Sequence, residues 1–298
     1  MASNTQSKNM KDPVKQYPQP PYPEQHQEVP GSDEKMNPKA DHGETSYKGS
    51  GKMLGRKAVI TGGDSGIGRA VAIAFAREGA DVLISYLDEH DDAKKTATFV
   101  EEAGRKVVLV PGDISNEEHC KTIIKKAVDE LGGIDVLVNN AAFQMSHDSL
   151  QELTSEELEH TFRTNIFSMF YLCKAAEPHL KPGSTIVNTT SVNAYKPNPT
   201  LVAYASTKGA IQNFTASLAG LWAEKGIRVN CVAPGPIWTP LIPSTFPPEE
   251  VSKFGQNTPM KRAGQPAELA AAFVLLASQD SSYMSGSTVQ VTGGTPTI

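Results

Sequence analysis

Residues 56–68 read RKAVITGGDSGIG, an apolar run followed by a glycine-rich turn and the beginning of a helical pattern. Gly62, Gly66 and Gly68 would let the backbone approach a phosphate closely, and the free amides and dipole of a helix start attract negative charge. A second apolar run, DVLISYL at 81–87, follows the helical pattern. This strand, helix and strand predict a dinucleotide-binding unit, although three residues instead of one separate the first two glycines. A plain strand-to-helix turn is the alternative.

Apolar runs and helical patterns continue to alternate after residue 51. Strand patterns lie at 58–60, 82–85, 107–110, 136–138, 185–188, 228–232 and 288–291. Seven such strands with helical crossovers predict an α/β fold, a Rossmann-type doubly wound parallel sheet in a single domain of residues 51–298. One helix is expected to begin at a capping-box pattern of Thr154 and Glu157, after which an apolar residue recurs at every fourth position: Leu158, Phe162, Ile166 and Phe170.

The first 50 residues differ in composition from the rest of the chain. They hold seven of the 21 prolines and almost no aliphatic periodicity, so they cannot bury a core of their own. The stretch YPQPPYPEQ at 17–25 favours an extended polyproline conformation with Tyr17 and Tyr22 exposed. Two alternatives are open for this arm: a disordered leader, or a segment that packs along its own domain or a neighbouring subunit.

Tyr204 and Lys208 stand one helical turn apart in the segment 204–226, so both side chains leave the same face of a helix. A phenol with a pKa of about 10 exchanges protons poorly at neutral pH, but a nearby ammonium and a cationic nicotinamide would stabilise the phenolate and lower that pKa. Ser191 closes the apolar run STIVNTTS, where its hydroxyl can hydrogen-bond a substrate oxygen. The three residues predict proton transfer at a carbonyl group, and a chance Tyr-x-x-x-Lys pair is the alternative.

Together these motifs resemble the short-chain dehydrogenase/reductase family. The resemblance covers residues 51–298 and rests on motifs in a fixed order: Thr61-Gly62-x-x-x-Gly66-Ile67-Gly68, Asn139-Asn140-Ala141, Ser191 and Tyr204-x-x-x-Lys208. The arm is similar to that of bacterial general-stress oxidoreductases, a branch with glucose/ribitol dehydrogenase-like members. Ala142 and Thr292 stand where the family more often has glycine and aspartate, and neither change removes a catalytic group.

The resemblance implies a catalytic set and a cofactor site. Tyr204 would exchange the proton, Ser191 would orient the substrate oxygen, and Lys208 would hold the nicotinamide ribose. The backbone carbonyl of Asn165 would anchor a water of the proton path. The positions that would bind the cofactor are Gly62, Asp64, Ser65, Gly66, Ile67, Gly68, Tyr86, Leu87, Asp113, Ile114, Asn140, Ala141, Tyr204, Lys208, Pro234, Gly235, Ile237 and Thr239. Asp113 would contact adenine, and a strand-end turn or helix cap explains this residue equally well.

The choice between NAD and NADP depends on the end of the second strand. Family members that use NAD often have an acidic residue there, which repels a 2′-phosphate, whereas members that use NADP commonly have a basic residue nearby. Tyr86 and Leu87 supply neither charge, and Asp88 and Glu89 follow them. We therefore expect NAD, with NADP or use of both cofactors as the alternative.

Residues 240–262 have the length and proline content of a mobile substrate loop. Because no Arg or Lys is clearly placed to clamp an anion, the expected substrate is a neutral aldehyde, ketone, alcohol or polyol. The predicted function is hydride transfer between NAD(P) and this substrate. The alternative is a cofactor-binding stress or redox-sensing protein that acts through partners. Expected contacts are Leu241, Ile242, Phe246, Phe254 and Met260 on the apolar side, and Gln144, Asn193 and Tyr195 as hydrogen-bonding groups.

Composition narrows the class of protein further. A net charge of −5 argues against general binding to nucleic acid or to an anionic membrane surface. Cys120, Cys173 and Cys231 lack metal-ligand spacing, so we expect reduced core thiols and no metal site. The absence of a signal-peptide or membrane-spanning pattern makes the cytoplasm the expected location. The family resemblance also implies a homo-oligomer, specifically a tetramer.

Overall fold

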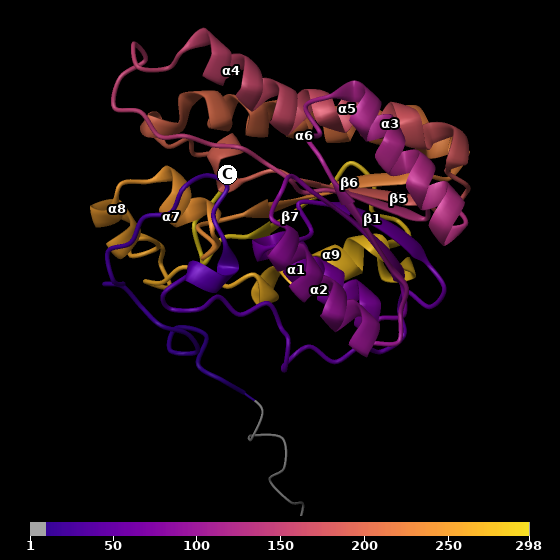
Figure 1. Ribbon diagram of the computed structural model, residues 1–298, viewed down its shortest axis with the longest axis horizontal. Coiled ribbons are helices and arrows are strands. Elements are labelled where there is room, and N and C mark those ends of the chain that lie inside the picture. The colour runs from indigo at the N-terminus through magenta and orange to yellow at the C-terminus, as the bar shows by residue number, and fades with distance from the viewer. Residues whose placement is uncertain (1–9, 298) are drawn as a thin grey trace, which may run out of the picture.

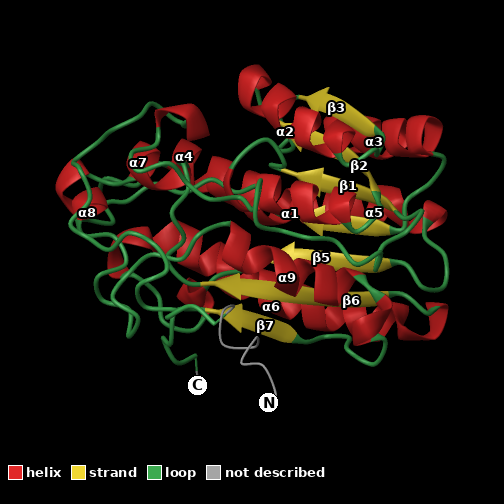
Figure 2. Ribbon diagram, turned by 90° about the horizontal axis from the view of Figure 1, so that it is seen from below, coloured by secondary structure: helices red, strands yellow, loops and turns green. Residues whose placement is uncertain are grey.

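The computed structural model describes residues 10–297, so residues 1–9 of the predicted arm and Ile298 lie outside the described residues. The centre of the molecule is a sheet of seven parallel strands in the order β3-β2-β1-β4-β5-β6-β7 (Figure 2). The strands are β1 (Lys57–Thr61), β2 (Asp81–Tyr86), β3 (Val107–Pro111), β4 (Val136–Asn139), β5 (Thr185–Thr189), β6 (Arg228–Pro234) and β7 (Thr288–Val291). The predicted α/β fold is confirmed, and each predicted strand is found with nearly the predicted limits.

Helices cover both faces of this sheet. Figure 1 shows α1, α2 and α9 on one face, and α3, α5 and α6 on the other. The helices are α1 (Gly66–Arg77), α2 (His90–Glu102), α3 (Glu117–Lys126), α4 (Ser155–Phe162), α5 (Ser168–Ala176), α6 (Val202–Trp222), α7 (Leu241–Thr245), α8 (Pro248–Ser252) and α9 (Ala267–Ala277). Because both faces are covered, the central strands β1, β2 and β4 are buried along nearly their whole length, whereas the edge strand β3 alternates between buried and partly exposed residues. The three cysteines are buried free thiols, as predicted.

The strand order reverses beside β1, which pairs with β2 on one side and with β4 on the other. Crossover connections leave such a position toward opposite faces of the sheet, and a crevice opens beyond the strand ends. The glycine-rich turn follows β1, and Asn140 follows β4. The Asn140 side chain donates to the Gly62 carbonyl over 3.2 Å, so the two loops meet at this crevice.

The helix predicted from Thr154 onward is divided into α4, a π-helical turn at Arg163–Phe167, and α5. Thr154 Oγ1 accepts from the Glu157 amide, as the capping pattern predicts, but the Glu157 carboxylate contacts His147 instead. Of the predicted apolar row, only Ile166 is buried, while Leu158 and Phe170 are 41% and 53% exposed. A spacing of four exceeds the 3.6-residue turn, so the row winds around the helix and leaves the core.

Residues 10–50 pack along their own domain, which is the second of the two alternatives for the arm. Tyr22 is only 6% exposed, and its ring lies 4.4 Å from that of Trp238 between centroids. The Tyr17 hydroxyl donates to Asp41 over 2.7 Å. The expectation of two exposed tyrosines is therefore wrong for Tyr22, because its apolar partner comes from a distant part of the chain.

A buried ionic cluster fixes the middle of the arm to the domain. Asp33 Oδ2 lies 3.2 Å from Arg69 Nη1 and 3.0 Å from His42 Nε2. Arg69 Nη2 also lies 2.8 Å from Asp92 Oδ1, and His42 Nδ1 lies 2.8 Å from Glu44 Oε1. Burial lowers the pKa of His42, but Asp33 and Glu44 more than offset this effect and raise that pKa to about 9. The imidazole is therefore a cation at neutral pH.

From the protonated His42 imidazole we expect a contribution to the free energy of unfolding that depends on pH. Because the folded pKa of about 9 exceeds the unfolded value, the contribution is complete below the unfolded pKa and is lost as the pH rises through 9. We expect His42→Gln to lower the melting temperature at pH values below the unfolded pKa and to flatten its decline at alkaline pH. Thermal unfolding followed by circular dichroism over this range measures the difference. His26→Gln, at an exposed arm position, is the control, and parallel pH curves for wild type and His42→Gln would contradict the prediction.

Candidate active site

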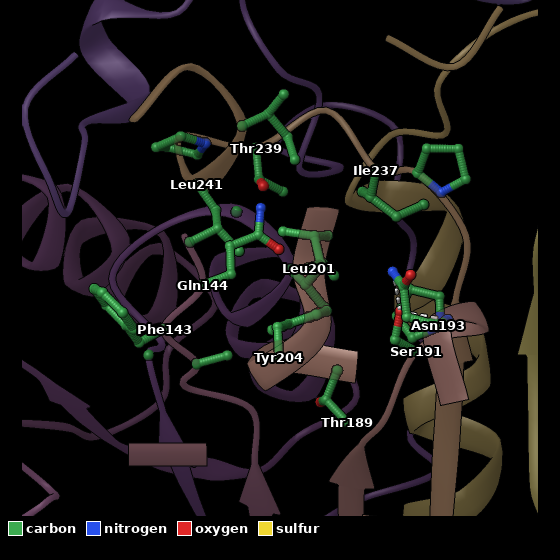
Figure 3. Close-up of a pocket in the computed structure, with 18 of the residues that line it drawn as sticks. Phe143, Gln144, Thr189, Ser191, Asn193, Leu201, Tyr204, Ile237, Thr239 and Leu241 are labelled. Carbon is green, nitrogen blue, oxygen red and sulfur yellow. Dashed lines mark hydrogen bonds between the residues drawn. The ribbon is translucent and has the colours of Figure 1, made fainter. Parts of the chain in front are cut away.

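Three of the predicted catalytic side chains meet at the crevice. Ser191 follows β5, and Tyr204 and Lys208 lie in the first turns of α6. Lys208 Nζ donates to the Thr189 carbonyl over 2.9 Å and lies 5.1 Å from the centroid of the Tyr204 ring. Ser191 Oγ accepts from the backbone and side-chain nitrogens of Asn193, over 3.1 and 3.3 Å. Figure 3 shows Tyr204 and Ser191 at the wall of one cavity.

Burial changes the proton affinities of Tyr204 and Lys208. It raises the pKa of Tyr204 to about 12, although the Ser191 side chain lowers that pKa in part. It lowers the pKa of Lys208 to about 7. The predicted lowering of the Tyr204 pKa includes a bound cationic nicotinamide, so it stays a prediction for the complex with cofactor. The sequence shows that a lysine is near, but the desolvation of both groups depends on the packing around them.

Asn165 lies behind the cavity wall, in the π-helical turn before α5. Its side-chain oxygen accepts from the Phe143 amide over 2.7 Å. Its side-chain nitrogen donates to the Phe143 carbonyl and to Thr207 Oγ1 over 2.8 and 3.1 Å. The side chain therefore joins three segments of the site, and the neighbouring Thr164 is the residue that lines the cavity. The predicted role of the Asn165 carbonyl stays a prediction.

The cavity has a volume of about 1050 Å³. It is lined by the predicted cofactor residues Gly62, Asp64, Ser65, Gly66, Ile67, Tyr86, Leu87, Asp113, Ile114, Asn140, Ala141, Tyr204, Lys208, Pro234, Gly235, Ile237 and Thr239. The remaining one, Gly68, lies behind the wall, where an added Cβ would stand 1.8 Å from the Gly62 carbonyl oxygen. Gly68 is therefore required for close packing of the loop on itself and does not line the cavity.

The glycine-rich turn has the backbone conformation that its sequence predicts. Gly62 and Gly66 have φ values of +61° and +49°, which residues with a Cβ rarely adopt. An added Cβ at these positions would lie 3.0 Å from Ala141 and 3.0 Å from Thr239, respectively. The turn is thus enclosed by the loops after β4 and β6, and a side chain on either glycine would fill the space between them.

Two carboxyl groups lie at the end of the cavity next to β2. Asp64 is buried, and burial followed by the charge of Glu89 raises its pKa to about 7. Glu89 lines the same part of the cavity and was missing from the predicted set. The Tyr86 hydroxyl lies 3.1 Å from His90 Nδ1, so it is held on the protein side. Asp113 accepts from the Ser115 amide and hydroxyl, so it serves as the predicted strand-end turn and also lines the cavity.

The opposite end of the cavity carries the expected substrate contacts. Residues 240–262 contain the helices α7 and α8 in place of an irregular loop. The Gln144 side chain donates to Thr245 Oγ1 over 2.8 Å, which joins the loop after β4 to α7. Met260 and Tyr195 lie outside the described cavity lining, whereas the other expected contacts belong to it. That lining contains Gln144, Asn193, Leu241, Ile242, Phe246 and Phe254.

The sequence does not predict several charged residues of the cavity lining, nor the residues of the arm that belong to that lining. Lys196, Lys253, Glu249 and Glu250 are exposed side chains at the cavity. Because two carboxylates accompany the two lysines, the expectation that no Arg or Lys is clearly placed to clamp an anion stays a prediction. Val29 and Pro30 also line the cavity. No local pattern could have indicated these arm residues, because they reach the site through contacts that are distant in the sequence.

Residues 62–296 match a family model described as enoyl-(acyl carrier protein) reductase. General stress protein 39 of Bacillus subtilis is 56% identical over 265 residues, which cover 89% of this chain and 93% of that protein. This chain belongs to the short-chain dehydrogenase/reductase family. The predicted resemblance, which includes the general-stress branch, is confirmed.

Two further family members bear on the chemistry. Glucose and ribitol dehydrogenase of Daucus carota is 46% identical over 278 residues, covering 91% of this chain and 96% of that protein. A short-chain dehydrogenase of Burkholderia cenocepacia in complex with NADP has a TM-score of 0.77 at 28% identity. The structural match covers 82% of this chain and 98% of the Burkholderia chain. The presence of NADP in that structure gives no support to the predicted preference for NAD. Within residues 10–297, none of the helices combines the length and apolar character needed to cross a membrane.

Proposed function

We propose that this protein is an NAD(P)-dependent oxidoreductase that interconverts a neutral carbonyl compound and its alcohol, with Tyr204 as the proton donor and acceptor. The single observation that carries the proposal is the arrangement of Tyr204, Ser191 and Lys208 at one cavity, beyond the ends of β1 and β4. When bound, the nicotinamide cofactor would supply or accept the hydride.

The residues at the crevice fit a dinucleotide. Ser65, Gly66 and Ile67 at the start of α1 line the cavity, and the positive φ values of Gly62 and Gly66 favour residues without side chains in the turn. The loop after β6 contributes Pro234, Gly235, Ile237 and Thr239 to the opposite wall. Lys208, held by the Thr189 carbonyl, would bind the ribose next to the nicotinamide.

The protonation state of Tyr204 indicates the direction of proton transfer. A phenol with a pKa of about 12 is protonated at neutral pH and is ready to donate to a carbonyl oxygen. The Ser191 hydroxyl, fixed by Asn193, would hold that oxygen next to the phenol. A proton on Lys208 would favour the phenolate that remains. We therefore propose reduction at neutral pH and an increasing rate of oxidation toward alkaline pH.

A small hydroxylated substrate suits the other end of the cavity. Gln144 and Asn193 offer hydrogen bonds, Leu241 and Phe246 offer apolar contacts, and the charges of the exposed lysines and glutamates balance. The name of the carrot relative, glucose and ribitol dehydrogenase, supports a sugar or polyol. We propose a polyhydroxylated aldehyde or ketone as the substrate class.

The absorbance of reduced nicotinamide tests this proposal directly. Purified protein is assayed with NADH and with NADPH against a panel of aldehydes, ketones, sugars and polyols. Turnover with a graded preference among hydroxylated substrates would support the proposal. Binding of a cofactor without turnover of any substrate would overturn it and favour the alternative, a stress or redox-sensing protein that acts through partners.

Cofactor choice gives a more specific prediction. Asp64 and Glu89 would face the adenosine end of the cofactor, where their negative charge disfavours a 2′-phosphate, so we still propose NAD as the preferred cofactor. Glu89→Gln is expected to raise kcat/KM for NADPH relative to NADH by about fivefold, since one nearby like charge contributes about 1 kcal/mol even in water. Asp88→Asn, at an exposed neighbouring position, is the control. An equal change in kcat/KM for both cofactors, or no change in either, would contradict the proposed role of Glu89.

We also propose a homotetramer, with helices α4 to α6 at a subunit interface. Phe167, Phe170 and Val202 are 40%, 53% and 50% exposed in one protomer, on or beside these helices. Large apolar side chains that are exposed on helices packed against one another favour an association site. A monomeric mass in light scattering at micromolar concentration would contradict this proposal.

A further inference from the structure

Residues 22–42 of the arm, here called the strap, run between the two walls of the cavity. One wall is the glycine-rich turn and the start of α1. The other is the segment 237–252, which contains α7 and α8. Figure 1 shows the indigo arm passing beside α7 and α8 and then beside α1. The strap therefore contacts the parts of the chain that are proposed to enclose the cofactor.

The strap is fixed to the segment 237–252 by backbone hydrogen bonds. The Tyr22 amide donates to the Ser252 carbonyl over 2.8 Å, and the Gln27 amide donates to the Pro243 carbonyl over 2.9 Å. Trp238 Nε1 donates to the Pro38 carbonyl over 2.8 Å. At Gly31, whose φ is +83°, an added Cβ would lie 2.7 Å from the Pro240 carbonyl oxygen. The strap thus lies in direct contact with this wall along its length.

The strap is fixed to the other wall by one carboxylate. Among the described residues, the side chain of Ser65 makes no cap hydrogen bond at the start of α1. Instead, Asp33 Oδ2 accepts from the Gly66 amide over 3.0 Å. The Asp33 amide donates to Asp92 Oδ2 over 3.2 Å, and Arg69 and His42 neutralise the Asp33 carboxylate. A residue of the arm therefore caps the helix whose first turn faces the cavity.

Other attachments of the arm lie away from the cavity and serve as a comparison. The Tyr47 hydroxyl donates to Glu78 Oε1 over 2.7 Å, and the Ser50 amide donates to Glu78 Oε2 over 2.8 Å. Neither Tyr47 nor Glu78 belongs to the described cavity lining, whereas Val29, Pro30 and Gly66 do. An arm that only stabilised the fold would need only contacts such as those with Glu78, which lie away from the cavity.

We propose that the strap is part of the cofactor site, and that Asp33 is the positioning residue through which it holds the glycine-rich turn in its binding conformation. With Asp33 in place, the turn and the segment 237–252 keep a fixed separation before the cofactor arrives. Loss of this anchor makes the two walls independent, so binding must first order them and release becomes faster. The inference rests on the proposed function, because it assumes a dinucleotide in this cavity.

The test uses the full chain and compares Asp33→Ala with Tyr47→Phe. Dissociation constants and release rates of NADH and NADPH are measured by fluorescence in stopped flow, together with kcat, both KM values and the melting temperature. We expect Asp33→Ala to weaken cofactor binding about tenfold or more, the effect of losing a hydrogen bond to a charged group. Its kcat at saturating cofactor should stay within about twofold of wild type, because no reacting group is altered. Tyr47→Phe should lower only the melting temperature.

Three results separate the possible failures. An unchanged cofactor dissociation constant in a folded Asp33→Ala variant would overturn the strap proposal. If wild type itself binds neither cofactor, the proposed function fails, and the strap proposal fails with it. If Asp33→Ala does not fold, Gly31→Ala is measured in its place, since its Cβ would lie 2.7 Å from the Pro240 carbonyl oxygen and so displace the strap, with Asp33 two residues further on, from the segment 237–252. A folded Gly31→Ala variant with wild-type cofactor affinity would also reject the proposal.

Discussion

Replacing Tyr204 by phenylalanine is expected to reduce kcat by roughly 10²- to 10⁴-fold while leaving the cofactor dissociation constant nearly unchanged. The substitution removes one hydroxyl from a ring that lies among Lys208, Ser191 and the cavity, and it leaves the ring itself in place. The effect is therefore confined to the proton transfer. Steady-state kinetics with saturating cofactor and a separate binding titration measure the two quantities.

The pH profile gives a second measure of the same residue. Because burial holds the Tyr204 pKa at about 12, the group is a proton donor at neutral pH, and reduction should be the faster direction there. Tyr195→Phe is the matched control, since this tyrosine is exposed and lies outside the described cavity lining. If Tyr204→Phe turned over within a few-fold of wild type, another group would have to supply the proton.

Gly68→Ala is expected to cause the second large effect, a loss of both stability and cofactor binding. An added Cβ would stand 1.8 Å from the Gly62 carbonyl oxygen and 2.9 Å from Asn140 Nδ2, so the backbone of the turn must move. Overpacking of this kind costs about 3 kcal/mol, and a comparable loss in the bound state corresponds to roughly a hundredfold weaker cofactor binding. Thermal unfolding and a cofactor titration measure these losses.

Gly220 provides the control for this substitution. It is exposed near the end of α6, and nothing lies within 4 Å of an added Cβ. Gly220→Ala should therefore stabilise the protein by about 0.5–1 kcal/mol, the difference in helix propensity. Equal behaviour of the two variants would show that the close approach at Gly68 has no consequence for the turn.

The parts of the site that the sequence predicts are those encoded by local patterns. Strands such as β4 contain apolar runs because both faces are buried, and Tyr204 and Lys208 share a helix face because of their spacing. In each case the residues that form the pattern lie within a few positions of one another in the sequence. These patterns were sufficient to predict the sheet and the place of Tyr204 and Lys208 at one cavity.

The parts that it does not predict depend on contacts between distant segments. Tyr22 appears exposed until Trp238 is known to lie against it, and Asp33 resembles any polar arm residue until it meets Gly66 and Arg69. Burial also raises the pKa of Tyr204, and burial is a property of the packed cavity that no local pattern encodes. Lys196 and Lys253 reach the cavity through loops whose paths no periodicity describes.

The pairing of the arm with the far end of the chain determines the order in which the molecule can be completed. The carbonyls of Pro13 and Pro38 accept hydrogen bonds from Arg262 and Trp238, across 249 and 200 positions of sequence. During synthesis the arm is made before its partners, which follow 200 or more positions later, and such distant contacts form slowly. Until then Tyr22 and Met36 have no apolar surface to cover them. The arm can therefore take its packed position only after the segment that contains Trp238 and Arg262 has been made.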